Sequence, residues 1–229
     1  MPIWLYYLGF ATYLNLMKYV FFMRNEVIKK YVEKYSLGVV EIKNSLEQYN
    51  SFFKNMGFKE PIEKLIEERL KNKKVVKILD VGCGNAGFLA ELNDLFGEKI
   101  HTIGVDLLAP EKPINEVILG DAVEVNFPKD VDFVFSFRTL HEIGEPEKII
   151  KKIYSSLAKE GKAFLSFRTM DLYAGGKGIA ELKAKEIKKL RKMVELGKLK
   201  EFNVSGFEVS IKDEKGNTHV AGVNVFLEK

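Results

Sequence analysis

From residue 75 onward, short runs of β-branched and aromatic residues alternate with longer segments of helical periodicity. Such runs predict strands, which we expect over Val75–Val81, Ile100–Val105, Glu116–Leu119, Val131–Phe135 and Lys162–Phe167. Helices are expected between them over Ala86–Phe96 and Glu147–Lys159, and Gly161 would end the second one. Apolar strands separated by helices are typical of a parallel sheet covered on both faces.

The last part of the chain changes to a two-residue period. Ile179–Leu196 reads as an amphipathic helix, and Phe202–Ile211 and His219–Leu227 alternate between apolar and polar residues around a polar turn. This pattern predicts an antiparallel β-hairpin. The fold class is therefore α/β, with a doubly wound, mostly parallel seven-stranded sheet that ends in this hairpin.

The N-terminal segment differs from the rest of the chain. Residues 1–23 hold eight aromatic side chains and one charged residue, Lys18, and their apolar positions recur every three or four residues. This spacing predicts an amphipathic helix, and Pro61 begins another helix that runs to about Leu70. We expect residues 1–74 to form a helical N-terminal cap or lid, and residues 75–229 to form the main domain.

Three interpretations of residues 1–23 compete with a lid. They are a homodimer interface, an interfacial membrane contact and a membrane span, although polar residues on one helical face interrupt the apolar run and disfavour the span. A signal peptide is excluded because the segment has neither a positively charged start nor a small-residue cleavage site. In the lid interpretation, these residues and the stretch around Tyr49, Phe52 and Phe53 cover the active site.

A glycine-rich turn between the first predicted strand and its helix is the strongest chemical signal. Gly82 and Gly84 permit a tight turn and are expected to let a ligand approach bare backbone N–H groups. Gly82, Gly84 and Gly87 match a dinucleotide fingerprint, but Asp80 precedes them at the end of the strand. A carboxylate there repels a pyrophosphate and attracts an ammonium or sulfonium group. Charge therefore favours S-adenosylmethionine over NAD.

The segment Asp80–Gly84 and the segments that follow it resemble the class I S-adenosylmethionine-dependent methyltransferases, which have a Rossmann-like fold. The resemblance is detailed over residues 75–168, and Ala86 departs from it by replacing the third glycine of the loop. It implies that Asp106 accepts hydrogen bonds from both ribose hydroxyls and that Asp121 accepts one from the adenine amino group. The cofactor-binding residues that it implies are Asp80, Gly82, Cys83, Gly84, Asp106, Leu107, Asp121, Ala122, Ser136 and Phe137.

The resemblance also implies direct displacement, in which the acceptor attacks the methyl group in line and S-adenosylhomocysteine leaves. His141 is the candidate general base, and helix capping is its alternative role. Ser136 is expected to offer its backbone rather than a nucleophile, and Cys83 to fill space in the loop. The stretch Ser136–Thr139 lacks the Pro-Pro and Pro-Cys motifs of two common nucleic-acid methyltransferase chemistries. We therefore expect methyl transfer to a small or apolar molecule.

Two alternatives to this function stay open. Residues 183–200 carry eight positive and two negative charges, and such a segment could track phosphates in an RNA methyltransferase or simply be a solvated helix face. A protein acceptor belongs to the same alternative. The second alternative is a non-catalytic S-adenosylmethionine-binding module whose aromatic N-terminus docks a partner.

The composition of the chain limits the functions that it can have. The 229 residues carry a net charge of +4, a small excess for a dedicated nucleic-acid binder. Cys83 is the only cysteine, which excludes an intramolecular disulfide and fits a cytoplasmic location. The histidines His101, His141 and His219 do not have metal-ligand spacing, so no metal is expected. Lys and Glu dominate the charged residues, which suggests a thermophilic source.

Overall fold

The computed structural model describes residues 44–137, 139–140, 146–168, 201–212 and 218–229. The chain divides into two compact units, residues 1–42 and 43–229, and all of the described residues lie in the second. The apolar segment 1–23, the candidate base His141 and the basic segment 183–200 lie outside the described residues. The roles expected of them stay predictions.

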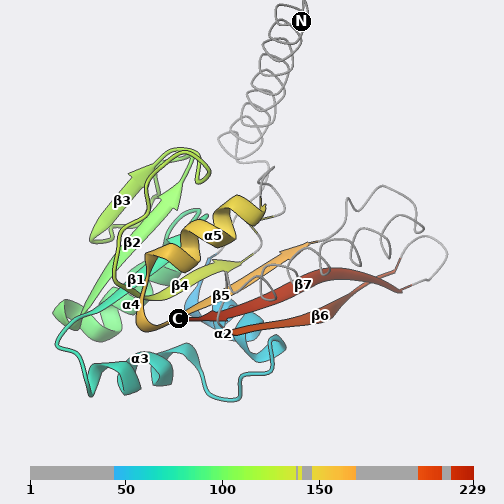
Figure 1. Ribbon diagram of the computed structural model, residues 1–229, viewed down its shortest axis with the longest axis horizontal. Coiled ribbons are helices and arrows are strands. Elements are labelled where there is room, and N and C mark those ends of the chain that lie inside the picture. The colour runs from blue at the N-terminus through green and yellow to red at the C-terminus, as the bar shows by residue number, and fades with distance from the viewer. Residues whose placement is uncertain (1–43, 138, 141–145, 169–200, 213–217) are drawn as a thin grey trace, which may run out of the picture. The chain divides into compact units, whose positions relative to one another are not determined.

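A mixed sheet forms the centre of the described unit (Figure 1). Its seven strands are β1 (Val76–Val81), β2 (Ile100–Asp106), β3 (Glu116–Leu119), β4 (Val131–Phe137), β5 (Leu157–Arg168), β6 (Glu201–Lys212) and β7 (Thr218–Glu228). They lie in the order β3-β2-β1-β4-β5-β7-β6. Strands β1 to β5 pair in parallel, whereas β7 is antiparallel to both β5 and β6. The predicted mostly parallel sheet with a C-terminal antiparallel hairpin is confirmed.

Helices cover both faces of the sheet, as expected for a doubly wound fold. On one face, α5 (Pro146–Ser156) buries Ile149, Ile150 and Ile153 in a core with apolar residues of β1, β2, β4 and β5. The opposite face is covered by α2 (Leu46–Asn55), α3 (Ile62–Leu70) and α4 (Gly87–Phe96), and a 3-10 turn (Gly97–Lys99) follows α4. Burial on both faces explains the nearly continuous apolar runs of the central strands.

Strand order reverses direction between β1 and β4. The chain runs outward from β1 through β2 to β3, then crosses to the other side of β1 to form β4. Ligands of open α/β sheets bind outside the carboxyl ends of the strands at such a reversal. The fold therefore places the candidate site at the ends of β1, β2 and β4.

The expected end of the helix after β4 is wrong. This helix ends at Ser156 instead of Lys159, and Leu157 begins β5 by pairing with Val131 of β4. Gly161 lies inside β5, where a Cβ atom would lie only 2.8 Å from the carbonyl oxygen of Val131. This glycine therefore permits two strands to approach each other closely and does not cap a helix.

The predicted boundary after residue 74 does not separate two bodies. Tyr49 and Phe53 of α2 and Ile62 and Ile66 of α3 are buried in the core that α4 shares with β1 and β4. The described part of the predicted cap is thus packed on the sheet, because these apolar side chains need its aromatic face for burial.

A buried carboxylate attaches α3 and the following linker to the sheet. Asp132, at the start of β4, accepts hydrogen bonds from Arg69 Nε at 2.9 Å and Lys73 Nζ at 2.8 Å. The basic stretch before β1 is therefore held against the start of β4.

Candidate cofactor site

The loop from β1 to α4 makes a tight turn with two glycines in the left-handed region. Gly82 has φ +83° and Gly84 has φ +56°. A Cβ atom at Gly82 would lie 2.1 Å from Thr139 Oγ1, so only glycine lets the segment after β4 lie against the loop. The glycines are thus required for both the turn and the close approach.

The N–H groups of this loop are used within the protein. Gly82 N and Cys83 N both donate to the carbonyl oxygen of Val105, at 2.7 and 3.3 Å, and Gly84 N donates to Asp106 Oδ2 at 2.9 Å. The expectation that the two glycines present bare N–H groups to a ligand is therefore wrong. The reason is that the turn closes onto the end of β2 rather than toward solvent.

Asp80 is a buried acidic residue near the end of β1. Its side chain is fully buried, Oδ2 accepts a hydrogen bond of 2.8 Å from the Tyr49 hydroxyl, and Oδ1 has no partner among the described residues. Burial raises the pKa of Asp80 to about 8; the Tyr49 hydrogen bond opposes this rise and the Asp106 charge adds to it. The carboxyl group is therefore mostly protonated at neutral pH, and a buried cation beside Oδ1 would favour its ionised form.

Helix α2 holds the other side of Asp80. Its N-cap, Ser45, accepts a hydrogen bond from Gln48 N, and one turn later Tyr49 stacks on Phe88 of α4 with ring centroids 3.9 Å apart. Asn44 Nδ2 donates to the carbonyl oxygen of Cys83 at 2.9 Å, which joins the start of α2 to the glycine loop. Burial raises the pKa of Tyr49 well above its usual value, so the hydroxyl stays a donor to Asp80.

The sequence placed Tyr49 only in a covering layer and missed its bond to Asp80. Asn44 and Thr139 were not identified at all. The aromatic cluster at positions 49, 52 and 53 is the signal that pointed to this region. No local pattern indicates which strand residue a helical tyrosine will reach.

Asp106 ends β2 beside the glycine loop. It is 6% exposed; Oδ2 accepts from Gly84 N, and Oδ1 accepts from Leu108 N at 3.1 Å. Burial raises the pKa of Asp106, and the backbone N–H groups partly offset that rise. A carboxylate oxygen accepts more than one hydrogen bond, so each oxygen still has room for a hydroxyl donor.

The loop after β3 is tied to both neighbouring elements. Gly120 N donates to the backbone carbonyl of Asp106 at 2.9 Å, and Asp121 Oδ1 accepts from Val123 N at 2.8 Å, which caps the turn. From α5, Lys152 Nζ donates to three carbonyl oxygens of this loop, those of residues 122, 123 and 125. Lys152 thus holds the backbone around Ala122, a role that nothing in the sequence indicated.

Two side chains of the predicted set point into the protein. Ser136 Oγ is buried and donates to the carbonyl oxygen of Val81 at 2.8 Å, which couples β4 to β1. Cys83 is buried against Gly104, and burial raises the pKa of its thiol. An inert thiol and a bonded hydroxyl agree with the expectation that neither acts as a nucleophile. Phe137, the last residue of β4, packs on Tyr49 at a centroid distance of 5.0 Å.

The described residues of the predicted set gather along the carboxyl edge of β3, β2, β1 and β4, as hydrogen bonds between their loops show. A family model described as a methyltransferase domain matches residues 52–209. The chain belongs to this family. The resemblance to the class I S-adenosylmethionine-dependent methyltransferases is thereby confirmed.

Solved structures of other methyltransferases resemble this methyltransferase domain. Phosphoethanolamine N-methyltransferase 2 of Haemonchus contortus, solved with phosphomonomethylethanolamine and S-adenosylhomocysteine, is 21% identical with a TM-score of 0.46. The match covers 62% of this chain but only 38% of that enzyme. An S-adenosylmethionine-dependent methyltransferase of Archaeoglobus fulgidus is 17% identical with a TM-score of 0.47, over 72% of this chain and 94% of the other. Similarities at this level concern the fold alone. No curated protein matches the chain.

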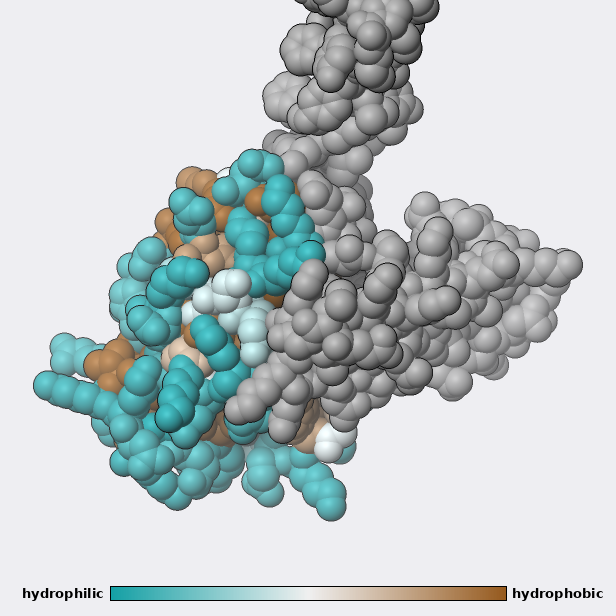
Figure 2. All heavy atoms as spheres, in the orientation of Figure 1, coloured by the Kyte–Doolittle hydropathy of each residue, from teal (hydrophilic) through white to brown (hydrophobic). Residues whose placement is uncertain are grey.

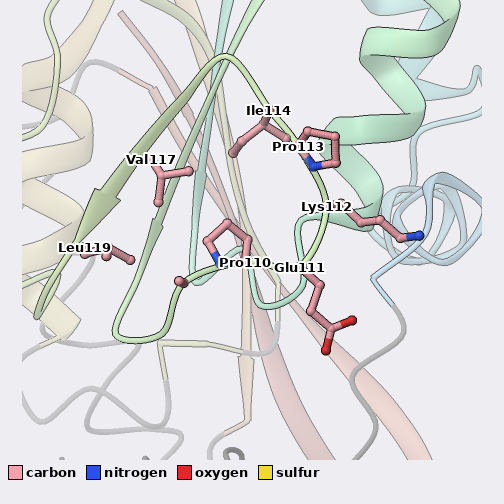
Figure 3. Close-up of a pocket in the computed structure, with 8 residues that line it drawn as sticks. Pro110, Glu111, Lys112, Pro113, Ile114, Val117 and Leu119 are labelled. Carbon is pink, nitrogen blue, oxygen red and sulfur yellow. The ribbon is translucent and has the colours of Figure 1, made fainter.

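A separate pocket of about 440 Å³ lies at the edge of the methyltransferase sheet (Figure 3). It is bordered by Val117 and Leu119 of β3 and by the loop Ala109–Ile114, and none of the predicted site residues lines it. Val117 and Leu119 are exposed, and Figure 2 shows hydrophobic spheres near β3 on an otherwise mostly hydrophilic described surface. This pocket is distinct from the cofactor site.

Within the described ranges, no helix is both long and apolar enough to cross a membrane. Among those same residues, no group of three or more His, Cys, Asp or Glu side chains is placed to hold a metal ion.

Proposed function

We propose that this methyltransferase domain binds S-adenosylmethionine at the carboxyl ends of β1, β2 and β3 and transfers its methyl group to a small or apolar molecule. The observation that carries the proposal is Asp80 Oδ1, a fully buried carboxyl oxygen without a described partner. A buried polar atom left unpaired costs about 1–3 kcal/mol, so its retention is best explained by a ligand donor. The ammonium group of the methionine moiety supplies both a donor and a positive charge.

The glycine loop supports a cationic ligand over a dinucleotide. A pyrophosphate needs free N–H donors, and those of Gly82, Cys83 and Gly84 are already bonded to Val105 and Asp106. It would also lie against the carboxyl group of Asp80. A ligand without phosphate meets neither obstacle, so the structure favours the adenosyl amino acid.

The neighbouring loops suit the nucleoside part. Asp106 holds its carboxylate at the end of β2 with one backbone donor on each oxygen, and it would accept the two ribose hydroxyls. Leu107 is half-buried beside it and would lie against the adenine ring. Asp121 and the Ala122 backbone, held by Lys152, would read the ring edge.

The chemistry supplied by the bound cofactor is an electrophilic methyl group on a sulfonium. That methyl group would be open to in-line attack by an acceptor lone pair, with the electron pair of the carbon–sulfur bond left on sulfur. The residues of this chain act by holding both partners in line and by excluding water. Tyr49, Phe52 and Phe137 pack together at the end of β4 with ring centroids 5.0–6.5 Å apart, an apolar environment that suits a small or apolar acceptor.

Other roles also remain proposals. They are His141 as general base, residues 1–23 as a lid, a homodimer contact or a membrane contact, and a cytoplasmic location. An RNA or protein acceptor and a non-catalytic binding role are outcomes that a methylation screen would distinguish.

Calorimetry with S-adenosylhomocysteine, 5′-methylthioadenosine and NAD tests the cofactor assignment. We expect S-adenosylhomocysteine to bind and NAD not to bind. Because the ammonium favours ionised Asp80, whose pKa is about 8 without ligand, binding at pH 7 should release about one proton. Asp80→Asn should abolish that release and weaken S-adenosylhomocysteine at least tenfold, but leave methylthioadenosine, which lacks the amino acid, within about twofold. Binding of NAD without S-adenosylhomocysteine would overturn the assignment.

A further inference from the structure

Two polar side chains meet in the sheet beyond the candidate cofactor site. Ser166 of β5 is in register with Asn224 of β7, and on its other side Ser166 is in register with Phe137, the last residue of β4. The pair therefore lies beside the carboxyl end of β4, on the side away from β1. It belongs to none of the residue sets that bind the adenosyl group.

Neither side chain has its hydrogen-bonding capacity satisfied. Ser166 is 2% exposed and Asn224 is 3% exposed, yet Ser166 Oγ and Asn224 Nδ2 have no partner among the described residues and so do not bond to each other. The only other buried side-chain atom of this kind in the described ranges is Asp80 Oδ1. The three buried side-chain atoms without a partner among the described residues thus fall on the carboxyl half of one sheet.

All three residues lie on the same face. Asp80 is in register with Phe135, Phe135 with Phe164, and Phe164 with Phe226, which makes one row across four strands. Ser166 and Asn224 lie two residues from Phe164 and Phe226 along β5 and β7, and side chains two residues apart share a face. This is the face on which α2 packs, since the ring centroids of Phe53 and Phe164 are 4.8 Å apart.

The surroundings of the pair are aromatic. The rings of Phe135 and Phe164 stack at 5.4 Å, and Phe226 lies 5.3 Å from Phe164, so an aromatic floor borders the pair on the side away from the strand ends. Phe137 lies beside Ser166, and its ring centroid is 5.4 Å from that of Phe52 in α2. A hydroxyl and a carboxamide in such surroundings lose their hydration without replacement unless a ligand provides it.

We infer that Ser166 and Asn224 recognise the methyl acceptor, and that the acceptor is a neutral molecule with an apolar, ring-like body and an oxygen that accepts a hydrogen bond. Asn224 Nδ2 is a donor, and the Ser166 hydroxyl both donates and accepts, so a phenol, alcohol or carbonyl oxygen satisfies both groups. Neither side chain carries a charge that would offset burial of a carboxylate or phosphate. This inference rests on the proposed function, because it assigns the second substrate of the same reaction.

The test uses full-length protein loaded with S-adenosylhomocysteine and three fluorinated probes followed by ¹⁹F NMR: 4-fluorophenol, fluorobenzene and 4-fluorobenzoate. The phenol should bind wild-type protein more tightly than the other two. Ser166→Ala and Asn224→Leu should each weaken the phenol at least fivefold and leave fluorobenzene unchanged or slightly tighter. Both variants should also raise the melting temperature, because each removes an unsatisfied buried atom.

Ser156→Ala is the matched control. Ser156 is also a buried serine, but its Oγ donates to the carbonyl oxygen of Ile153 at 2.7 Å, so this variant should lower stability and leave probe binding unchanged. Preference for 4-fluorobenzoate, equal phenol binding by wild-type and Asn224→Leu protein, or no phenol binding at all would overturn the inference. Loss of S-adenosylhomocysteine binding is measured separately and would contradict the proposed function instead.

Discussion

Replacing Asp80 with Asn should stabilise the ligand-free protein and weaken cofactor binding. The change keeps the shape of the side chain and the acceptor for the Tyr49 hydroxyl, but it removes the ionisable group. Asp80 is an unusual core residue because its carboxyl group is fully buried with one oxygen unpaired. Without a cationic ligand this group works against folding, so its removal should help the ligand-free protein.

The magnitude follows from the pKa of Asp80, which burial raises from 3.8 to about 8. When the pKa of a carboxyl group is higher in the folded state than in the unfolded state, the free energy of unfolding falls as pH rises from the unfolded pKa to the folded pKa. Below the unfolded pKa the group is protonated in both states and this loss is absent. At about 1.4 kcal/mol per pH unit, the loss is about 4 kcal/mol at pH 7 and approaches about 6 kcal/mol above pH 8. These values are upper limits for the gain from Asp80→Asn, because local relaxation lowers the cost of burial.

The assay is urea and thermal unfolding of wild-type and Asp80→Asn protein without ligand at pH 4, 6 and 8. Even a gain of about 2 kcal/mol at pH 8 would raise the melting temperature by roughly 4–8 °C for a domain of this size. The gain should shrink to almost nothing at pH 4, where the carboxyl group is half protonated even when unfolded. Asp94→Asn, on the exposed side of α4, controls for the change in net charge and should show no such trend.

Ligand should narrow the difference in stability between the two proteins. At about 100 times its Kd, S-adenosylhomocysteine stabilises the wild-type protein by about 2.7 kcal/mol, and the variant should gain much less. The refuting result is an Asp80→Asn protein that is less stable than wild type by the same amount at pH 8 and at pH 4. Burial of the ionisable carboxyl group would then not lower the stability of the wild-type protein.

Three further predictions concern the loops around the site. Asp106→Ala should weaken S-adenosylhomocysteine and methylthioadenosine alike by at least tenfold, about 1.4 kcal/mol in calorimetry, because both share the ribose; a loss confined to one ligand would contradict the ribose role. Gly82→Ala should abolish cofactor binding, since its Cβ would overlap Thr139, whereas Gly57→Ala, with φ +95° but open space around it, should cost about 1–2 kcal/mol of stability and leave binding intact. Lys152→Met should lower stability by about 1.5–3 kcal/mol and weaken methylthioadenosine severalfold, because loop carbonyls lose a charged donor; unchanged nucleoside affinity would show that Lys152 does not position the adenine loop.

Local sequence patterns were sufficient to predict the sheet and the acidic and glycine residues at the carboxyl ends of its strands. The strand Glu116–Leu119 was predicted with the bounds that the structure has, and β1 and β2 differ from their predictions by one residue. These elements were predictable because apolar runs and glycine turns act through neighbouring residues. The early end of α5 was not predictable, because it depends on Leu157 pairing with Val131 of another strand.

The sequence by itself determined which residues are available to a cofactor: an acidic residue before a glycine turn, and acidic residues after the next two strands. Only the tertiary structure decided which hydrogen-bond partners those residues have. It turned the loop N–H groups onto Val105, brought Tyr49 to one oxygen of Asp80 across 31 residues of sequence, and left the other oxygen unpaired. It also placed Ser166 beside Asn224 in an aromatic environment. Turn and strand formation are local, whereas the partner of a buried polar atom depends on strand register and on which helix packs over it.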